Sequence, residues 1–182
     1  MFVDNIRIFA RAGKGGNGLV SFRRAKFVPK GGPDGGDGGD GGSVILEVDP
    51  HTNDLRSFFY DPKLIATDGV GGQSAKKHGK NGKSVIGKVP PGTIIYRSNA
   101  SSMAEATWLE REGEGIELEK IADLTEIGTR FTLCQGGLGG KGNWHFRSAT
   151  NQAPTEAEMG TEGEEGVFFM ELRRIADAGL VG

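Results

Sequence analysis

Residues 33–42 read Pro-Asp-Gly-Gly-Asp-Gly-Gly-Asp-Gly-Gly, so that Asp34, Asp37 and Asp40 are separated each time by two glycines. A three-residue repeat fits neither a β-strand, with its period of 2.0, nor an α-helix, with its period of 3.6. It fits the polyproline II helix, which has three residues per turn and no internal hydrogen bonds. Such a helix must pack on neighbours, and glycine lets backbones approach closely enough to bond to one another. The stretch therefore predicts a bundle of glycine-rich polyproline II helices.

Glycine accounts for 32 of the 182 residues, more than twice its ordinary share of roughly 7%. Further glycine-rich stretches cover residues 13–18, 69–82, 136–142 and 160–166. The alternative is that these stretches are flexible linkers, but they interrupt strand-like segments repeatedly instead of joining two domains. We therefore expect them to be further members of the bundle, with Gly35, Gly38 and Gly41 as structural glycines inside it.

Short apolar segments alternate with the glycine-rich ones and predict β-strands. They cover residues 5–11, 44–48, 85–89, 116–121, 131–134 and 167–172. Ser102 and Glu105 have the spacing of a capping box at a helix N-terminus, and Gly113 follows as a stop signal. A helix is therefore expected over residues 103–112, within a fold that is mainly β.

The formal net charge of −2 hides a strong separation of charge along the chain. Residues 21–32, 69–97 and 131–150 carry basic side chains and no acid. Residues 98–128 instead hold eight acidic and two basic side chains, and residues 151–171 hold six acidic side chains and no basic one. Cationic loops of this kind suit contacts with phosphate groups. The alternative is that they are ordinary solvated surface.

Several functional classes lack support in the sequence. Cys134 is the only cysteine, which excludes an internal disulfide and a cysteine metal cluster and favours a reduced, cytoplasmic setting. No apolar stretch approaches the ~20 residues of a membrane span, so none is expected. Aspartates three residues apart in a polyproline II helix lie about 9 Å apart along its axis, too far to share one metal ion. We therefore expect no metal site and interpret these acids as solvated groups. No set of residues with the spacing of a catalytic site stands out either.

Three segments match parts of nucleotide-binding motifs: Gly13-x-Gly15-x-x-Gly18, Gly137-x-Gly139-x-x-Gly142 and Gly82-Lys83-Ser84. The first two would need a helix whose N-terminus faces the pyrophosphate, and no helical pattern follows either of them. The third would need a glycine where Lys77 stands, and Pro90 and Pro91 would break the helix that must follow. None of the three is therefore interpreted as a nucleotide site.

Three other stretches carry a family resemblance. They are Phe22-Arg23-Arg24 with Phe27-Val28-Pro29-Lys30-Gly31-Gly32-Pro33 leading into Gly35-Gly36-Asp37-Gly38-Gly39; Val89-Pro90-Pro91-Gly92-Thr93; and Gly136-Gly137-Leu138-Gly139-Gly140-Lys141-Gly142-Asn143 followed by Phe146, Ser148, Asn151, Ala153 and Pro154. Together they resemble the N-terminal domain of the Obg family of GTPases. The resemblance covers nearly the whole chain.

The resemblance implies a domain organisation. Residues 1–175 would form the Obg fold, a β-sheet or barrel-like base that carries the glycine-rich polyproline II bundle. Residues 98–120 are longer than the usual connection in the family and are interpreted as an acidic insertion. Residues 176–182 look like the start of the GTPase domain, with Gly182 as the first P-loop glycine of an incomplete nucleotide site. GTP and Mg²⁺ are implied for the full-length protein, and no cofactor is expected for this chain.

The resemblance also implies a function: binding to the large ribosomal subunit and its ribosomal RNA, in a GTPase that acts late in the assembly of that subunit. We expect the RNA-binding surface on three loops, residues 23–30, 76–83 and 141–147. The candidate contacts are Arg23, Arg24, Lys26, Lys30, Lys76, Lys77, His78, Lys80, Lys83, Lys141, Asn143, His145 and Arg147. Trp144, His145 and Phe146 are suited to stacking on unpaired bases. The alternative is a protein-interaction module that docks regulatory partners without RNA.

We expect this chain by itself to bind no GTP, because the P-loop that the resemblance implies is incomplete at Gly182 and has no phosphate-binding lysine. Calorimetric titration with GTP and Mg²⁺ measures this directly. Binding with a micromolar Kd would show that one of the rejected motifs is a nucleotide site.

Overall fold

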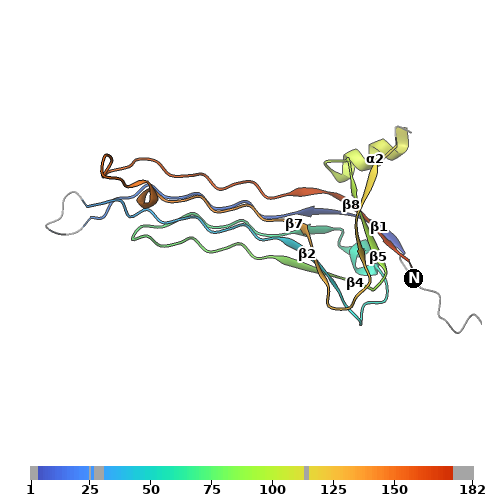
Figure 1. The fold of residues 1–182 in the computed structure, drawn as a ribbon. Coiled ribbons are helices and arrows are strands. Elements are labelled where there is room, and N and C mark those ends of the chain that lie inside the picture. Colours follow the sequence, from blue (N-terminus) through green and yellow to red (C-terminus); the bar gives the residue numbers. More distant parts are fainter. Residues whose placement is uncertain (1–3, 25, 27–30, 113–114, 174–182) are drawn as a thin grey trace, which may run out of the picture.

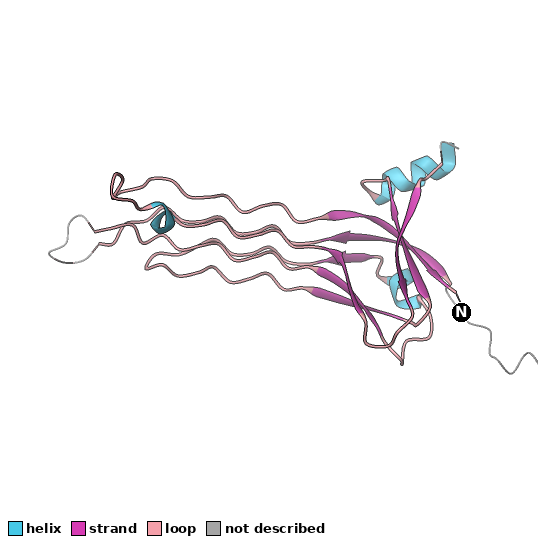
Figure 2. Cartoon of the chain, viewed as in Figure 1, coloured by secondary structure: helices cyan, strands magenta, loops and turns pink. Residues whose placement is uncertain are grey.

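The computed structural model describes residues 4–24, 26, 31–112 and 115–173, and it has three parts. The base contains the β-strands, and a long shaft of extended segments projects from it (Figures 1 and 2). The tip is the far end of the shaft and comprises residues 20–24, 26, 31–34, 74–77 and 143–153. Two predicted site residues, Lys30 and Gly182, lie outside the described residues, as does the segment 176–182.

The base is built from two open sheets. One has the strand order β3-β1-β8-β5-β6 and the other β4-β2-β7. The strands are β1 (Asn5–Arg11), β2 (Val44–Val48), β3 (Lys63–Ile65), β4 (Val85–Val89), β5 (Thr93–Ser98), β6 (Leu118–Leu124), β7 (Arg130–Cys134) and β8 (Glu165–Leu172). The prediction of a mainly β fold is confirmed. The base is not barrel-like, however, because neither sheet closes on itself within the described part of the chain.

The inward-facing side chains of both sheets form one apolar core. Ile8 of β1 lies opposite Phe168 of β8, and both are buried together with Leu46 of β2. Cys134, at the end of β7, belongs to the same core. Burial raises the pKa of its thiol to about 12, so the thiol stays protonated at neutral pH and is a poor nucleophile.

The two α-helices pack on the base. Helix α2 (Met103–Glu112) buries Ala106 and Leu109 against Val167 of β8. It starts as the capping-box spacing predicts, since the Ser102 hydroxyl accepts a hydrogen bond from the Glu105 amide at 3.1 Å. The stretch interpreted as an acidic insertion therefore supplies a helix that covers part of the five-stranded sheet. Helix α1 (Arg56–Tyr60) is one short turn that buries Phe58.

Six extended segments build the shaft. We name them S1 (residues 12–20), S2 (33–43), S3 (66–73), S4 (76–84), S5 (135–142) and S6 (154–164). Each is continuous with a strand, so the chain leaves the base along β1, β3 and β7 and returns along β2, β4 and β8. This course explains the two parallel pairings, because β1 and β3 both lead outward while β2 and β4 both lead back.

Backbone hydrogen bonds join these segments at steps of three residues. In S1 the amides of Gly13, Gly16 and Leu19 donate to the S2 carbonyls of Gly42, Gly39 and Gly36 at 2.8, 2.8 and 3.0 Å. In S2 the Gly38 amide donates to the Gly140 carbonyl of S5, and the Gly140 amide donates back to Gly16 of S1 at 2.9 Å. Three segments thus close a triangle of hydrogen bonds. S2, S3 and S4 are linked in the same way. The Gly39 amide of S2 donates to Val70 of S3, the Val70 amide donates to Lys80 of S4, and the Gly79 amide of S4 donates back to Asp37 of S2.

Most of the shaft glycines leave no room for a side chain. A Cβ atom added to Gly35, Gly38 or Gly41 would lie 1.8–1.9 Å from a backbone oxygen of S1. The other glycine of each pair faces a different neighbour, since Gly36, Gly39 and Gly42 lie against S4. The repeat of two glycines and one polar residue therefore corresponds to two faces packed on backbone and one face left for a side chain.

The strand predictions are confirmed for residues 5–11, 44–48 and 85–89, and the helix prediction for residues 103–112. The strand expected over residues 116–121 begins later, at Leu118, because Ile116 packs instead in the small core beneath α2. Strands β3 and β5 are absent from the prediction. Strand β3 has only three residues, and β5 follows directly on the turn signals Pro90, Pro91 and Gly92.

Replacing Gly38 with alanine should lower the free energy of unfolding by about 1–3 kcal/mol, because its Cβ would meet the Gly16 carbonyl oxygen at 1.9 Å. Gly71→Ala is the matched control, since the Cβ there would meet only the Asn17 carbonyl oxygen, at 3.5 Å. Urea unfolding of both variants measures the difference. Equal stabilities would mean that the close packing of S1 on S2 is not maintained in solution.

Candidate nucleic-acid interface

The tip joins turns that are distant in sequence. The Lys76 amide donates to the Asp34 carbonyl oxygen at 2.7 Å, and Phe22 pairs with Pro33 in an isolated β-bridge. One surface hollow is lined by Arg23, Lys76 and Arg147 together. The structure thus brings together a cation from each of the three stretches in which the sequence predicts RNA contacts.

The predicted loop of residues 76–83 is not a loop but segment S4, which runs back along the shaft. The Lys77 carbonyl accepts a bond from S3 near the tip, the Lys80 carbonyl accepts one in the middle, and the Lys83 carbonyl accepts one close to the base. Each step of three extended residues covers roughly 9–10 Å. The four exposed lysines therefore form a row along the molecule, and only Lys76 and Lys77 lie at the tip.

The remaining predicted cations within the described residues are exposed. Arg24, Lys26 and Arg147 lie at the tip, and Lys141 lies on S5 of the shaft. Among the described residues, neither Arg24 nor Arg147 forms an ion pair. Side chains of this kind are available to phosphate groups.

Asn143 has a structural position that the sequence did not indicate. It begins the short 3₁₀-helix Asn143–Phe146 and is fully buried. Its side-chain oxygen accepts a hydrogen bond from the Gly35 amide at 2.8 Å, and its side-chain nitrogen donates to the carbonyls of Ser21 and Pro154 at 3.0 and 3.1 Å. Asn143 therefore joins S2, S6 and the tip, and we leave it out of the contact surface.

His145 and His78 both approach Asp37 of S2. The His145 Nε2 atom lies 2.8 Å from one carboxylate oxygen of Asp37, and His78 Nδ1 lies 3.9 Å from the other. Burial acts to raise the pKa of Asp37, but the amide of Gly142 and the His145 ring outweigh it and hold that pKa below its ordinary value. Asp37 therefore stays ionised at neutral pH and anchors the two histidines.

The repeated aspartates bind backbone amides of a neighbouring segment. Asp37 accepts a bond from Gly142 of S5, and Asp40 accepts one from Gly139, both at 2.8 Å. Their interpretation as merely solvated acids is therefore wrong. The polar residue of each triplet satisfies the amides that the glycine contacts leave unbonded.

Trp144 lies at the tip, is partly exposed and has a cation beside it. The Lys76 ammonium lies 5.1 Å from the centre of its ring, within the range of a cation–π contact. The rings of Trp144 and His145 are close, with centroids 4.0 Å apart. The tip thus combines exposed cations with aromatic surface, the two features that single-stranded nucleic acid requires.

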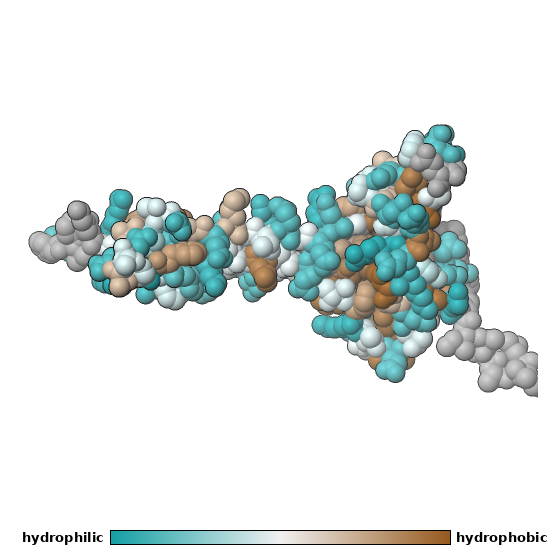
Figure 3. All heavy atoms as spheres, turned by 45° about the horizontal axis from the view of Figure 1, so that its top comes forward, coloured by the Kyte–Doolittle hydropathy of each residue, from teal (hydrophilic) through white to brown (hydrophobic). Residues whose placement is uncertain are grey.

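The acidic side chains lie mainly away from these cations. Residues 98–128 belong to the base, and Glu162 of S6 pairs with Lys14 of S1 at 3.4 Å. Figure 3 shows apolar surface gathered on the base, while most of the shaft surface is polar. The acid-rich residues 98–128 are therefore separated from the cations of the tip by the length of the shaft.

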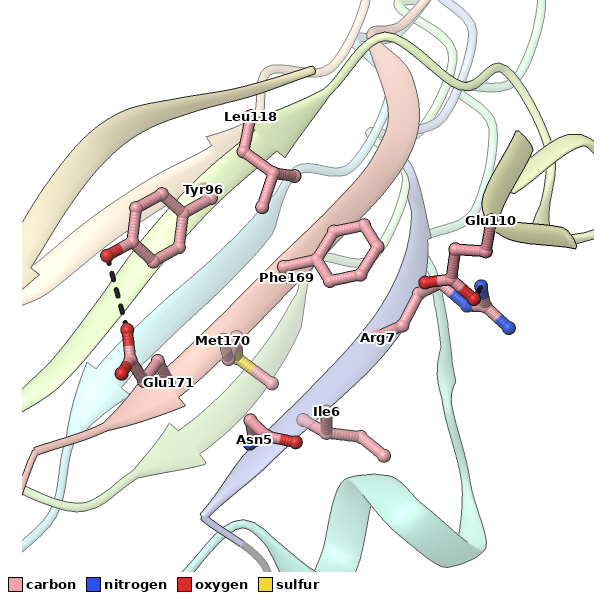
Figure 4. A pocket seen from close by; sticks show the side chains of 9 residues that line it. All are labelled: Asn5, Ile6, Arg7, Tyr96, Glu110, Leu118, Phe169, Met170 and Glu171. Atoms are coloured by element: carbon pink, nitrogen blue, oxygen red, sulfur yellow. Dashed lines mark hydrogen bonds and ion pairs between the residues drawn. The ribbon is translucent and has the colours of Figure 1, made fainter. Parts of the chain in front are cut away.

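A second hollow, of about 420 Å³, lies on the outer face of the five-stranded sheet beside α2 (Figure 4). Phe169 gives it an apolar centre. Its polar rim is internally satisfied, since Arg7 donates to Glu110 at 3.0 Å and the Tyr96 hydroxyl donates to Glu171 at 3.2 Å. We assign no chemistry to this hollow.

Neither a metal centre nor a membrane span is evident in the described part of the chain. Its histidine, cysteine, aspartate and glutamate side chains form no group of three or more that is placed to hold a metal ion. Its helices are too short or too polar to cross a bilayer.

Comparison with known proteins decides the family. A family model described as GTP1/OBG matches residues 3–174. The chain belongs to the GTP1/OBG family. Among curated relatives, it is similar to proteins named GTPase Obg from Methylacidiphilum infernorum (49% identity), Nautilia profundicola (48%) and Chlorobium chlorochromatii (50%). In each comparison all of this chain is covered, but only 50%, 46% and 48% of the relative. This GTP1/OBG chain therefore spans about half the length of the relatives it matches.

Replacing Asn143 with alanine should lower the free energy of unfolding by about 2–4 kcal/mol, because a buried amide and two carbonyls would lose their partner. Asn17→Ala is the matched control, since the exposed Asn17 side chain accepts only the Gly160 amide. It should cost about 1 kcal/mol. If urea unfolding gives equal losses, Asn143 does not hold the tip together.

Proposed function

We propose that this chain is the RNA-binding module of an Obg-type GTPase, and that it docks on ribosomal RNA of the large ribosomal subunit during late assembly. Membership of the GTP1/OBG family and relatives named GTPase Obg support the setting. The GTP hydrolysis, with GTP and Mg²⁺ as ligands, would belong to the remainder of the full-length protein. In this chain the proposal rests on one observation: Arg23, Lys76 and Arg147, from three distant stretches, line one hollow at the tip.

The electrostatics of the tip favour a phosphate backbone as partner. Each phosphate that a lysine or arginine neutralises releases counterions, which provides affinity independent of sequence. A narrow, stiff shaft carries these cations away from the acid-rich base, so a polyanionic partner at the tip stays clear of the acids of residues 98–128. Because the shaft is already hydrogen-bonded, little order must be gained on binding.

The tip surface is tested by two charge-matched variants. In the tip variant, Arg23, Lys76 and Lys77 are changed to glutamine. In the base variant the same change is made at Arg56, Lys63 and Lys88, which are also exposed but lie on the base. We expect the tip variant to bind large subunits more weakly. The slope of the logarithm of its binding constant against the logarithm of the salt concentration should be smaller in magnitude by about 2–3 units, the value for three lost phosphate contacts. The base variant should bind like the parent.

Co-sedimentation with purified large subunits at several salt concentrations is the measurement. If the base variant loses as much affinity as the tip variant, the interface is not at the tip. If the parent binds with no salt dependence, the contact is not made through phosphates. The protein-docking function would then be the better account.

A further inference from the structure

Asp34 holds the turn between S3 and S4 but uses only part of its carboxylate. Its Oδ2 atom accepts a hydrogen bond from the Ala75 amide at 3.1 Å, while its carbonyl accepts one from Lys76. Its Oδ1 atom is buried and has no hydrogen-bond donor among the described residues. A buried acceptor without a partner is unfavourable and calls for an explanation.

The turn that Asp34 holds has an uncommon backbone. Ala75 and Lys76 have φ angles of 59° and 58°, the left-handed region that residues other than glycine rarely adopt. Among the described residues these are the non-glycine positions with positive φ. Backbone of this kind persists where its surroundings enforce it, and it is concentrated at ligand-binding sites.

Two surface hollows adjoin this carboxylate. The larger, of about 550 Å³, is lined by Phe22, Arg23, Arg24, Asp34 and Ala75, among others, and Arg23, Asp34 and Ala75 also line the smaller one. The larger hollow has the size of a small-molecule site. Its lining combines an aromatic side chain, two cations and Asp34, whose unbonded Oδ1 atom is covered in the free protein.

We propose that this hollow receives one unstacked RNA nucleotide whose base carries an exocyclic amino group. The base lies against Phe22 and donates its amino hydrogen to Asp34 Oδ1, while Arg24 binds the adjoining phosphate. This subsite rests on the proposed RNA-binding function and adds base selectivity to it.

The carboxylate determines the class of base. An ionised carboxylate only accepts hydrogen bonds, so a bare phosphate would be repelled by it. Cytosine presents an amino donor at position 4 where uracil presents a carbonyl oxygen. The subsite therefore favours cytosine over uracil, two bases of the same size. Because Oδ1 is covered in the free protein, the proposal requires that side chains around the hollow move when a base enters; Arg23 is exposed and lines both hollows.

The substitution Asp34→Asn tests the proposal by the direction in which the affinity for large subunits changes. Asparagine keeps an oxygen for the Ala75 amide but replaces Oδ1 with a donor. If charge alone governed binding, loss of a negative side chain beside arginines would strengthen binding to large subunits. The proposal requires the opposite, a loss of about tenfold with an unchanged salt slope, because no phosphate contact is removed.

Base selectivity is tested with two nine-nucleotide RNAs at low salt, one of uridines only and one with a central cytidine. Fluorescence anisotropy should show the parent preferring the cytidine-containing RNA by about tenfold, and Asp34→Asn losing or reversing that preference. Asp40→Asn is the control, since Asp40 lies on the shaft and its carboxylate already accepts the Gly139 amide. That variant should keep the preference.

The outcomes separate this subsite from the proposed function. If Asp34→Asn binds subunits as tightly as the parent or more tightly, or if the preference for cytidine survives in it, the subsite is wrong while RNA binding stands. If the parent chain binds neither large subunits nor either RNA, both proposals fail.

Discussion

The hydrogen bond between backbone segments that approach as closely as glycine allows is the interaction on which the structure depends. Polar backbone groups that make no bonds within their own segment must find partners elsewhere. In the shaft, Gly16 donates to S2, Gly38 donates to S5, and Gly140 donates back to S1. A side chain at any of these positions would overlap a backbone carbonyl group, so the composition of the chain follows from the bonding pattern.

This constraint also places the functional groups. In S2 two of every three residues face backbone, so only the third carries a side chain outward, and these side chains form a row. In S2 the row includes Asp37 and Asp40, which bond to S5, and in S4 a second row contains lysines that face solvent. The shaft ends where the repeat ends, and the less regular turns of the tip hold Arg23, Lys76 and Arg147 around one hollow. The base contributes the apolar core that keeps the six segments aligned.

Much of this organisation could be predicted from sequence because it depends on local periods. The three-residue repeat indicated a bundle, and alternating apolar residues located β1, β2 and β4. What could not be predicted depends on pairing between distant segments. The partners of Asn143 lie up to 122 residues away, and those of Asp37 and Asp40 are 105 and 99 residues away. Four lysines close in sequence suggested one loop, whereas the extended course of S4 separates Lys83 from Lys76 along the shaft.

Native-state hydrogen exchange of the shaft amides tests the central claim most directly. If the glycine segments form one hydrogen-bonded bundle, the amides of Gly16, Gly38 and Gly140 should be strongly protected. They should also exchange with one common opening free energy, since opening one side of their triangle breaks the others. If these amides exchange at the rates of an unstructured glycine peptide, or each with its own low protection while the base remains protected, the bundle is not a cooperative structure and the account is wrong.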